Sequence, residues 1–306
     1  MRVEPVEPGV GQGRLTEAGG AALAALNRAC GTGYRLVRRL PSGYRAGAFL
    51  VRDDSGAEAV FKYGTDRTWA RHVVTAAPMV AAARRQGWPT PAWLAVGETD
   101  RGFLYLLQQR VPGSSPERLT VALARCVLPV VRWQRGRAPS TGQDWSAHDR
   151  ALVFADSGPL SRLRGYSPAG RRFARAVTAC LEPYRNVVVP DGDLVHGDLS
   201  PDNVLLHDDR LSAVIDVAAL GRGTRLHDLA SLLAHGTLWD GDPAARGYLH
   251  DEVRRRAAPG EFEVCLAAAL ISALTAHLTA HGRPDDADDL FARAIAGIEA
   301  AVGRGR

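Results

Sequence analysis

The stretch most informative about the fold of this 306-residue chain reads His196-Gly197-Asp198-Leu199-Ser200-Pro201-Asp202-Asn203-Val204-Leu205-Leu206. Asp198 stands five positions before Asn203, and Asp216 follows Asn203 by thirteen. The apolar run 204–206, a polar turn and the apolar run 211–215 predict the two strands of a hairpin. Because a hairpin reverses the chain, we expect it to return Asp216 to the side of Asn203.

These three side chains have the chemistry that transfer of a γ-phosphoryl group requires. One carboxylate orients the attacking hydroxyl, while an amide and a second carboxylate hold Mg²⁺ against the phosphates. The spacing predicts Asp198 as the catalytic base and Asn203 and Asp216 as oxygen ligands of the metal. Pro201 stiffens the middle of the loop. We expect His196 to brace the loop, because the nearby Asp198 already supplies the base.

The pattern resembles the signature of the aminoglycoside phosphotransferase family, which are bilobal small-molecule kinases with choline-kinase-like relatives. The resemblance extends to Gly221-x-Gly223 and to His227-Asp228-Leu229-Ala230. It implies an α+β, protein-kinase-like fold, with a small amino-terminal lobe of antiparallel sheet plus a helix and a larger, mainly helical carboxy-terminal lobe. It also implies a supporting role for Asp228, which would cap backbone amides near the catalytic loop.

Lys62 is the only lysine among the 38 lysine and arginine residues of the chain. It closes the third of three predicted strands, which lie near 34–40, 48–52 and 58–63. Kinases keep in that strand the lysine that pairs with the α- and β-phosphates. Since arginine replaces lysine everywhere else, a retained lysine indicates a site that needs a compact ammonium group. We therefore predict that Lys62 contacts the nucleotide phosphates.

Further nucleotide contacts are expected before and after this strand. The polar turn that contains Ser42 and Gly43 could cover the phosphates with backbone amides, although an ordinary hairpin turn is the alternative. The family resemblance implies that the carbonyl of Gln109 and the amide of Val111 bind the adenine edge. Leu107 and Val111 are candidates either to sandwich the ring or to belong to the core. ATP is the expected nucleotide, and the sequence does not separate it from GTP.

One feature departs from the family pattern. The family uses a helix after the lysine strand to supply a glutamate partner, and here that helix is predicted over 68–86. The only acid between Lys62 and Glu98 is Asp66, and the usual spacing falls near Thr75. Three explanations stand: the lysine is held by the metal-binding aspartate and the phosphates alone, another carboxylate reaches it, or the kinase is weak or inactive.

The remaining sequence can be organised as a loose tail over 1–14, a nucleotide-binding lobe over 15–109, and a lobe over 110–306 for the catalytic loop and the acceptor. Helical periodicity predicts helices over 15–30, 68–86, 116–134, 167–185, 226–238, 261–281 and 284–302. The apolar stretch 264–276 is too short to span a bilayer, so we expect a core helix and no membrane partner. The four cysteines lack metal-ligand spacing, and with no signal peptide they are typical of a cytoplasmic protein.

Charge patterning bears on the partners. The net charge is +5, but the arginine pairs are scattered and lack interleaved aromatic residues, so no nucleic-acid partner is expected. Carboxylates follow the hairpin, among them Asp240, Asp242 and a cluster at 285–289. A polycationic substrate would need such groups, whereas acids in a first helical turn also compensate the helix dipole. Asp240 and Asp242 are the candidate substrate-binding residues. The expected oligomeric state is a monomer or a homodimer.

The sequence thus predicts an ATP-dependent phosphotransferase that moves the γ-phosphate to a hydroxyl of a small molecule, with cationic compounds among the candidates. An aminoglycoside-type or other antibiotic is the first expectation, which would make the chain a resistance enzyme. Two alternatives stay open: a metabolite kinase acting on choline, homoserine or a sugar, and a nucleotide-binding pseudokinase without turnover.

Overall fold

The structure of the chain, a computed structural model, describes residues 15–40, 47–64, 66–100 and 102–304. The predicted tail over 1–14 and the turn residues Ser42 and Gly43 lie outside these ranges. The chain divides into two compact units: the first comprises 1–84 and 91–111, and the second comprises 85–90 and 112–306.

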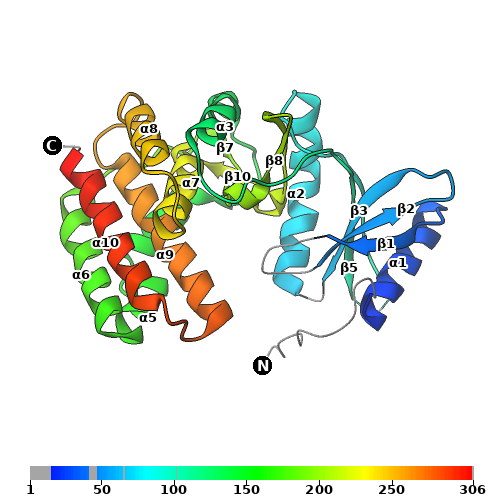
Figure 1. Ribbon diagram of the computed structural model, residues 1–306, viewed down its shortest axis with the longest axis horizontal. Helices are drawn as coiled ribbons and strands as arrows, with labels where there is room; N and C mark the ends of the chain where they lie inside the picture. Colours follow the sequence, from blue (N-terminus) through cyan, green and yellow to red (C-terminus); the bar gives the residue numbers. More distant parts are fainter. Residues whose placement is uncertain (1–14, 41–46, 65, 101, 305–306) are drawn as a thin grey trace. The chain divides into compact units, whose positions relative to one another are not determined.

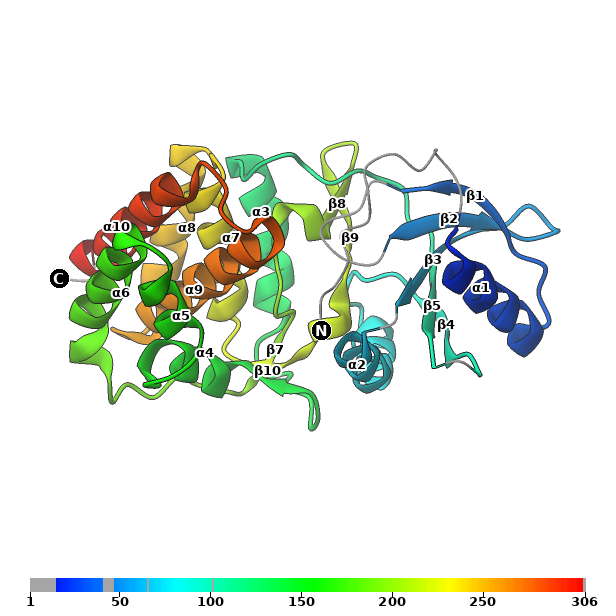
Figure 2. The same cartoon turned by 90° about the horizontal axis from the view of Figure 1, so that it is seen from below.

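The first unit is a five-stranded antiparallel sheet with two helices (Figure 1). The strands are β1 (Arg35–Arg39), β2 (Ala48–Arg52), β3 (Glu58–Gly64), β4 (Trp93–Glu98) and β5 (Leu104–Gln109), in the order β1-β2-β3-β5-β4. The helices are α1 (Glu17–Cys30) and α2 (Arg67–Arg85). Thr16 caps α1 by accepting a hydrogen bond from the amide of Gly19, and Gly31 ends it in the left-handed conformation. Helix α1 covers one face of the sheet (Figure 2).

The two faces of the sheet differ because side chains alternate along a strand. Phe61 and its cross-strand partner Leu107 belong to the apolar cluster beneath α1. Lys62, paired with Leu106, therefore projects from the opposite face. Of the two alternatives for Leu107, the structure selects the core, and Leu106 is the apolar neighbour of Lys62.

Helix α2 was predicted over nearly the same residues, with Pro78 inside it as expected. The helix carries no acid in its first turn. Asp66, the sole acid of this region, accepts a hydrogen bond of 2.7 Å from the amide of Thr68 at the start of the helix. This carboxylate therefore has a local capping role.

The second unit is mainly helical. Its helices are α3 (Val121–Trp133), α4 (Trp145–Phe154), α5 (Pro159–Tyr166), α6 (Pro168–Leu181), α7 (Leu226–Leu238), α8 (Pro243–Arg254), α9 (Glu261–His281) and α10 (Ala287–Arg304). The sequence predicted α7 and α9 with these bounds. The predictions over 116–134 and 284–302 began before α3 and α10, and the prediction over 167–185 ran past the end of α6. The sequence missed α4, α5 and α8. Together the two units confirm the α+β, protein-kinase-like fold.

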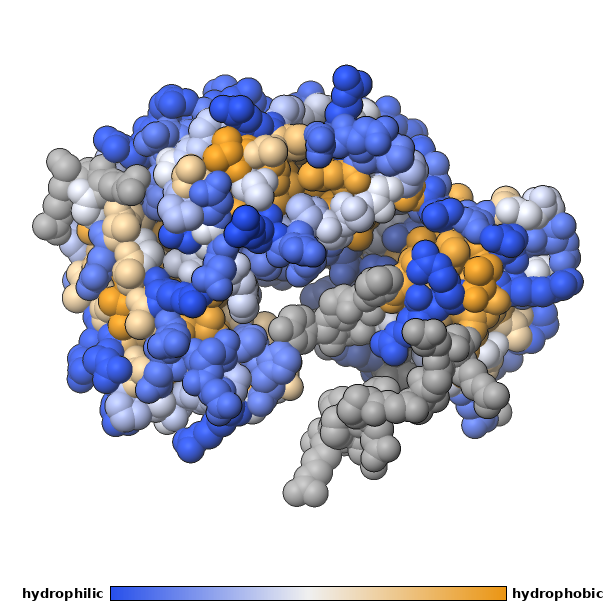
Figure 3. Space-filling model, viewed as in Figure 1, coloured by the Kyte–Doolittle hydropathy of each residue, from blue (hydrophilic) through white to orange (hydrophobic). Residues whose placement is uncertain are grey.

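Helix α9 lies in the core of this unit, where it packs against α7, α4 and α10. Among the described residues it alone has the length and composition to cross a membrane, yet 61% of its apolar window is buried inside the protein. The face drawn in Figure 3 is mostly hydrophilic, with scattered apolar patches. The burial of α9 is typical of a core helix.

Short strands flank the segment that holds Asp198 and Asn203. A three-stranded sheet joins β6 (Gln143–Asp144), β10 (Gly221–Gly223) and β7 (Asp193–Val195), with β10 in the middle. The predicted hairpin is formed by β8 (Val204–His207) and β9 (Arg210–Val214). Asp208 and Asp209 turn it with φ angles of 50° and 58°, the left-handed values that a tight hairpin needs at both central positions.

Candidate active site

The loop predicted to be catalytic, called the catalytic loop below, runs from the end of β7 to the start of β8, through a short 3-10 turn at Pro201–Asn203. The side-chain amide of Asn203 donates to the carbonyl oxygen of Asp198 at 2.7 Å and to its carboxylate at 3.3 Å. Because Nδ2 is thus occupied, Oδ1 is the atom of Asn203 that can face a cation.

Asp216 comes to the same place through the hairpin. The amide of Ile215 donates to the carbonyl oxygen of Asn203 at 2.9 Å. Asp216 has φ 60° and ψ 43°, a left-handed conformation that is uncommon for residues other than glycine and clusters at functional sites. Asn203 and Asp216 offer oxygen ligands, which suit Mg²⁺. In the described ranges no three His, Cys, Asp or Glu side chains form a metal cluster.

His196 is fully buried between these two segments. Its Nδ1 accepts a hydrogen bond of 3.1 Å from the amide of Asp198, and its Nε2 lies 2.9 Å from the carbonyl oxygen of Ile215. An amide N–H can only donate and a carbonyl can only accept, so these partners assign the ring proton to Nε2. His196 is therefore a neutral link between the catalytic loop and the residue before Asp216.

Asp228 supports the loop from the first turn of α7. Its buried carboxylate accepts hydrogen bonds from the amides of His196 at 2.8 Å and Gly197 at 3.0 Å. The side chain of Gln134 donates to it at 2.6 Å. Three donors stabilise the ionised carboxylate in a buried position.

Sequence reasoning missed a second layer around Gly197. Gly197 has φ +86°, and a Cβ atom there would lie 2.2 Å from Cζ2 of Trp145. The indole of Trp145 thus takes the space where a side chain would be, and its N–H donates to the carbonyl of Ala219 at 3.0 Å. Trp145 opens α4, one of the helices that were not predicted.

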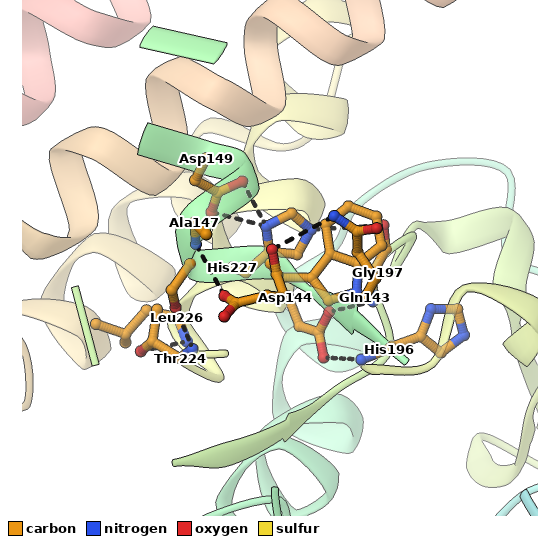
Figure 4. Close-up of polar contacts among 12 residues, drawn as sticks. Gln143, Asp144, Ala147, Asp149, His196, Gly197, Thr224, Leu226 and His227 are labelled. Carbon is orange, nitrogen blue, oxygen red and sulfur yellow. Dashed lines mark hydrogen bonds and ion pairs between the residues drawn. The ribbon is translucent and has the colours of Figure 1, made fainter. Parts of the chain in front are cut away.

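His227 and Asp149 belong to the same layer, and Figure 4 shows His227 between Asp149 and Gly197. Nδ1 of His227 lies 2.9 and 3.0 Å from the two carboxylate oxygens of Asp149, and Nε2 lies 3.4 Å from the carbonyl oxygen of Gly197. Burial lowers the pKa of His227, but the Asp149 carboxylate outweighs it and raises the pKa to about 9. One sequence signal was available: Asp149 precedes Leu152 and Val153 by three and four positions, which places a carboxylate on the apolar face of a helix.

The predicted nucleotide contacts lie in the first unit. Lys62 is on β3, and Gln109 ends β5. The amide of Gln109 donates to the carbonyl of Ala92 at 2.8 Å, and its side-chain oxygen accepts from Arg84 at 3.2 Å. Val111 is half-buried and is the last residue of this unit.

The candidate substrate carboxylates lie in the second unit. Asp240 forms an ion pair of 2.7 Å with Arg293, and both line a pocket of about 190 Å³ together with Trp239, Asp286 and Asp289. Asp242 caps α8 by accepting a hydrogen bond of 2.9 Å from the amide of Ala244. Asp240 therefore borders a cavity, whereas Asp242 caps a helix.

The fold and the loop define a protein-kinase-like small-molecule kinase with a hydroxyl group as acceptor. A model of the phosphotransferase enzyme family matches residues 36–262, so the chain belongs to that family. No curated protein sequence matches the chain.

Solved structures with the same fold are distant in sequence. Aminoglycoside phosphotransferase APH(4)-Ia is 17% identical with a TM-score of 0.68, over 94% of this chain and 99% of that one. Macrolide 2′-phosphotransferase MphH from Brachybacterium faecium is 17% identical with a TM-score of 0.59, over 90% and 97% of the two chains. A candidate fructosamine-3-kinase from Haemophilus somnus is 17% identical with a TM-score of 0.58, over 90% and 95%. A thermostable mutant of APH(4)-Ia was solved with ADP and hygromycin B.

Proposed function

We propose that the chain transfers the γ-phosphate of ATP to a hydroxyl of a small molecule, most simply an aminoglycoside-type or other antibiotic. One observation carries the proposal: Asp198, Asn203 and the end of the hairpin before Asp216 form a single hydrogen-bonded unit. Phosphoryl transfer needs a base and two oxygen ligands held in fixed relation.

The proposed mechanism is direct, in-line transfer. Asp198 orients the acceptor hydroxyl and takes its proton as the oxygen attacks the γ-phosphorus, and ADP leaves with the electrons of the broken P–O bond. His196 does not serve as the base, because its Nδ1 lone pair already accepts the amide of Asp198. Asn203 and Asp216 would hold Mg²⁺, which when bound neutralises charge on the phosphates.

The nucleotide contacts of this proposal come from the first unit. Lys62 would contact the α- and β-phosphates, Ser42 and Gly43 would cover the phosphates, and the backbone of Gln109 and Val111 would bind adenine. ATP is the proposed nucleotide, with GTP as the alternative, and the proposed setting is a cytoplasmic monomer or homodimer.

The pocket beside Asp240 supports a cationic acceptor. Its carboxylates at 240, 286 and 289 outnumber the single Arg293. A chain of contacts links it to the catalytic loop, since Asp202 lies 3.9 Å from Nε2 of His235 and the His235 ring packs against Trp239 with centroids 4.9 Å apart. Amino groups of an acceptor would find charge partners there. Asp242 remains a weaker candidate because it caps α8.

A metabolite kinase is the second candidate, and the shared fold of a candidate fructosamine-3-kinase favours keeping it. The pseudokinase alternative is motivated by α2, which has no acid in its sequence to pair with Lys62.

The test is an ADP-release screen with purified protein, ATP and Mg²⁺ over aminoglycosides, macrolides, choline, homoserine, sugars and fructosamines. We expect ADP release above the no-acceptor rate for an antibiotic bearing amino groups, with the phosphorylated product seen by mass spectrometry. Release only with a metabolite would select the second candidate. ATP binding without release for any acceptor would select the pseudokinase. Asp198→Asn is the control for a contaminating kinase.

A further inference from the structure

We propose that His227, held by Asp149, is a positioning residue that fixes the Gly197 peptide and thereby the direction of Asp198. The inference rests on the proposed role of Asp198 as the base. Neither His227 nor Asp149 would touch the substrate, so both act through the loop.

The hydrogen-bond partners of His227 define its charge state. Nδ1 faces the carboxylate of Asp149 and Nε2 faces the carbonyl oxygen of Gly197 (Figure 4). Both partners are acceptors, so each ring nitrogen must carry a proton and the ring is an imidazolium. His196, one residue before Gly197, is neutral by the same reasoning, because its Nδ1 accepts an amide.

Two adjacent residues of α7 hold opposite ends of Gly197. Asp228 accepts the Gly197 amide at 3.0 Å, and His227 points at the Gly197 carbonyl at 3.4 Å. The carbonyl of Gly197 belongs to the peptide that joins it to Asp198, so its orientation sets the backbone from which the Asp198 side chain projects. Trp145 fills the third side, with its ring centroid 4.6 Å from that of His227.

A buried ion pair such as Asp149–His227 is not explained by a gain in folding stability alone. Asp149 is fully buried and His227 is 4% exposed, and desolvating two charges often costs as much as their attraction returns. Apolar side chains could fill the same volume. They would not supply an N–H group directed at the Gly197 carbonyl, and this donor is what the pair adds to the catalytic loop.

The surrounding helices hold the pair in place. Asp149 comes from α4 and His227 from α7, and the buried thiol of Cys265 on α9 lies near Asp149. Burial and this carboxylate raise the pKa of Cys265 well above its usual value, so the sulfur stays a protonated, uncharged thiol. Three helices far apart in sequence thus surround the carboxylate of Asp149, the partner of His227.

The decisive variants are His227→Phe, which removes the donor, and His227→Gln, which keeps an amide donor. His250→Phe is the matched control, because His250 is 8% exposed on α8 and packs edge-on to Phe262. We expect kcat of the folded His227→Phe protein to fall at least about tenfold, the equivalent of one lost hydrogen bond, with the KM for ATP and acceptor within about threefold. His227→Gln should recover part of kcat, and His250→Phe should keep it. An unchanged kcat in His227→Phe, or an equal loss in His250→Phe, would overturn the proposal.

A second measurement does not depend on turnover. Nitrogen-15 NMR of ring-labelled wild-type protein at pH 7.5 should show one buried histidine with both nitrogens protonated, absent from the spectrum of Asp149→Asn. A His227 ring that is neutral at this pH would contradict the proposal. If no acceptor releases ADP from wild-type protein while the imidazolium is present, the proposed function fails and the loop geometry stands.

Discussion

The Nε2 atom of His196 donates a hydrogen bond of 2.9 Å to the carbonyl oxygen of Ile215. His196 begins the loop that carries Asp198, and Ile215 is the residue before Asp216. A buried, neutral imidazole therefore joins the proposed base and a proposed metal ligand, which are 18 positions apart in the sequence. Rigid links of this kind are how a protein fixes reacting groups before the substrate arrives.

Gly197→Ala should disrupt the loop. The added Cβ would lie 2.2 Å from Trp145, and φ of +86° disfavours any L side chain. Overpacking and backbone strain together should lower the free energy of unfolding by at least about 2 kcal/mol, measured by urea denaturation. Gly165→Ala in α5 is the control, because no atom lies within 4 Å of its Cβ position and its backbone is helical. Equal stability of the two variants would contradict the packing described for Trp145.

His227 should make stability depend on pH. Its pKa is raised from 6.5 to about 9 in the folded protein, so the folded state binds the proton more tightly. The stabilisation is complete below pH 6.5 and is lost as the pH rises toward 9, by up to about 3 kcal/mol at roughly 1.4 kcal/mol per pKa unit. The measurement is the difference in unfolding free energy between wild type and His227→Gln from pH 6 to 9.5. The difference cancels the titration of other groups, although the neighbouring Asp149, His148, Asp228 and Cys265 can shift the midpoint. A difference that grows with pH would have the wrong sign.

Asp216→Asn should weaken the binding of magnesium. Loss of one anionic oxygen ligand should raise the Mg²⁺ concentration for half-maximal ADP release at least about tenfold and lower kcat about a hundredfold. Asp209→Asn is the control, because Asp209 lies in the exposed turn of the same hairpin. A magnesium titration identical to that of wild type would remove Asp216 from the metal site.

Asp240 and Asp242 can be separated by two substitutions. Asp242→Ala should cost about 1 kcal/mol of stability through the lost cap of α8 and leave the KM of the acceptor unchanged. Asp240→Asn should raise the KM of a cationic acceptor about three- to tenfold, with little change in the melting temperature, because its ion pair with Arg293 is exposed. If Asp242→Ala raises the KM more than Asp240→Asn, the pocket is assigned to the wrong carboxylate.

The features that the sequence predicted are local. The hairpin of β8 and β9 follows from two apolar runs around a polar turn, and α7 and α9 have strong helical patterns. The face of Lys62 follows from the period of two once the sheet register is known. Leu107 shows the limit, because the same residue fits the core or the adenine site until α1 is placed against one face.

The features that were missed depend on contacts between distant segments. His227 is visible in the sequence only as the neighbour of Asp228, and its partner Asp149 lies 78 positions away. The helix predicted over 116–134 ends at Gln134. Nothing in the neighbouring sequence indicates that the side-chain amide of Gln134 binds Asp228. Helix α4 is only 10 residues long and follows a loop, so its pattern was too short to recognise.

The most direct test of the central claim is Asp198→Asn assayed with the best acceptor. The substitution keeps the size of the side chain and removes the charge that would take the hydroxyl proton. We predict a fall in kcat of at least about a hundredfold, while the Kd of ATP, measured by calorimetry, stays within about twofold. Turnover within threefold of wild type in the folded variant would contradict the assignment of Asp198 as the catalytic base.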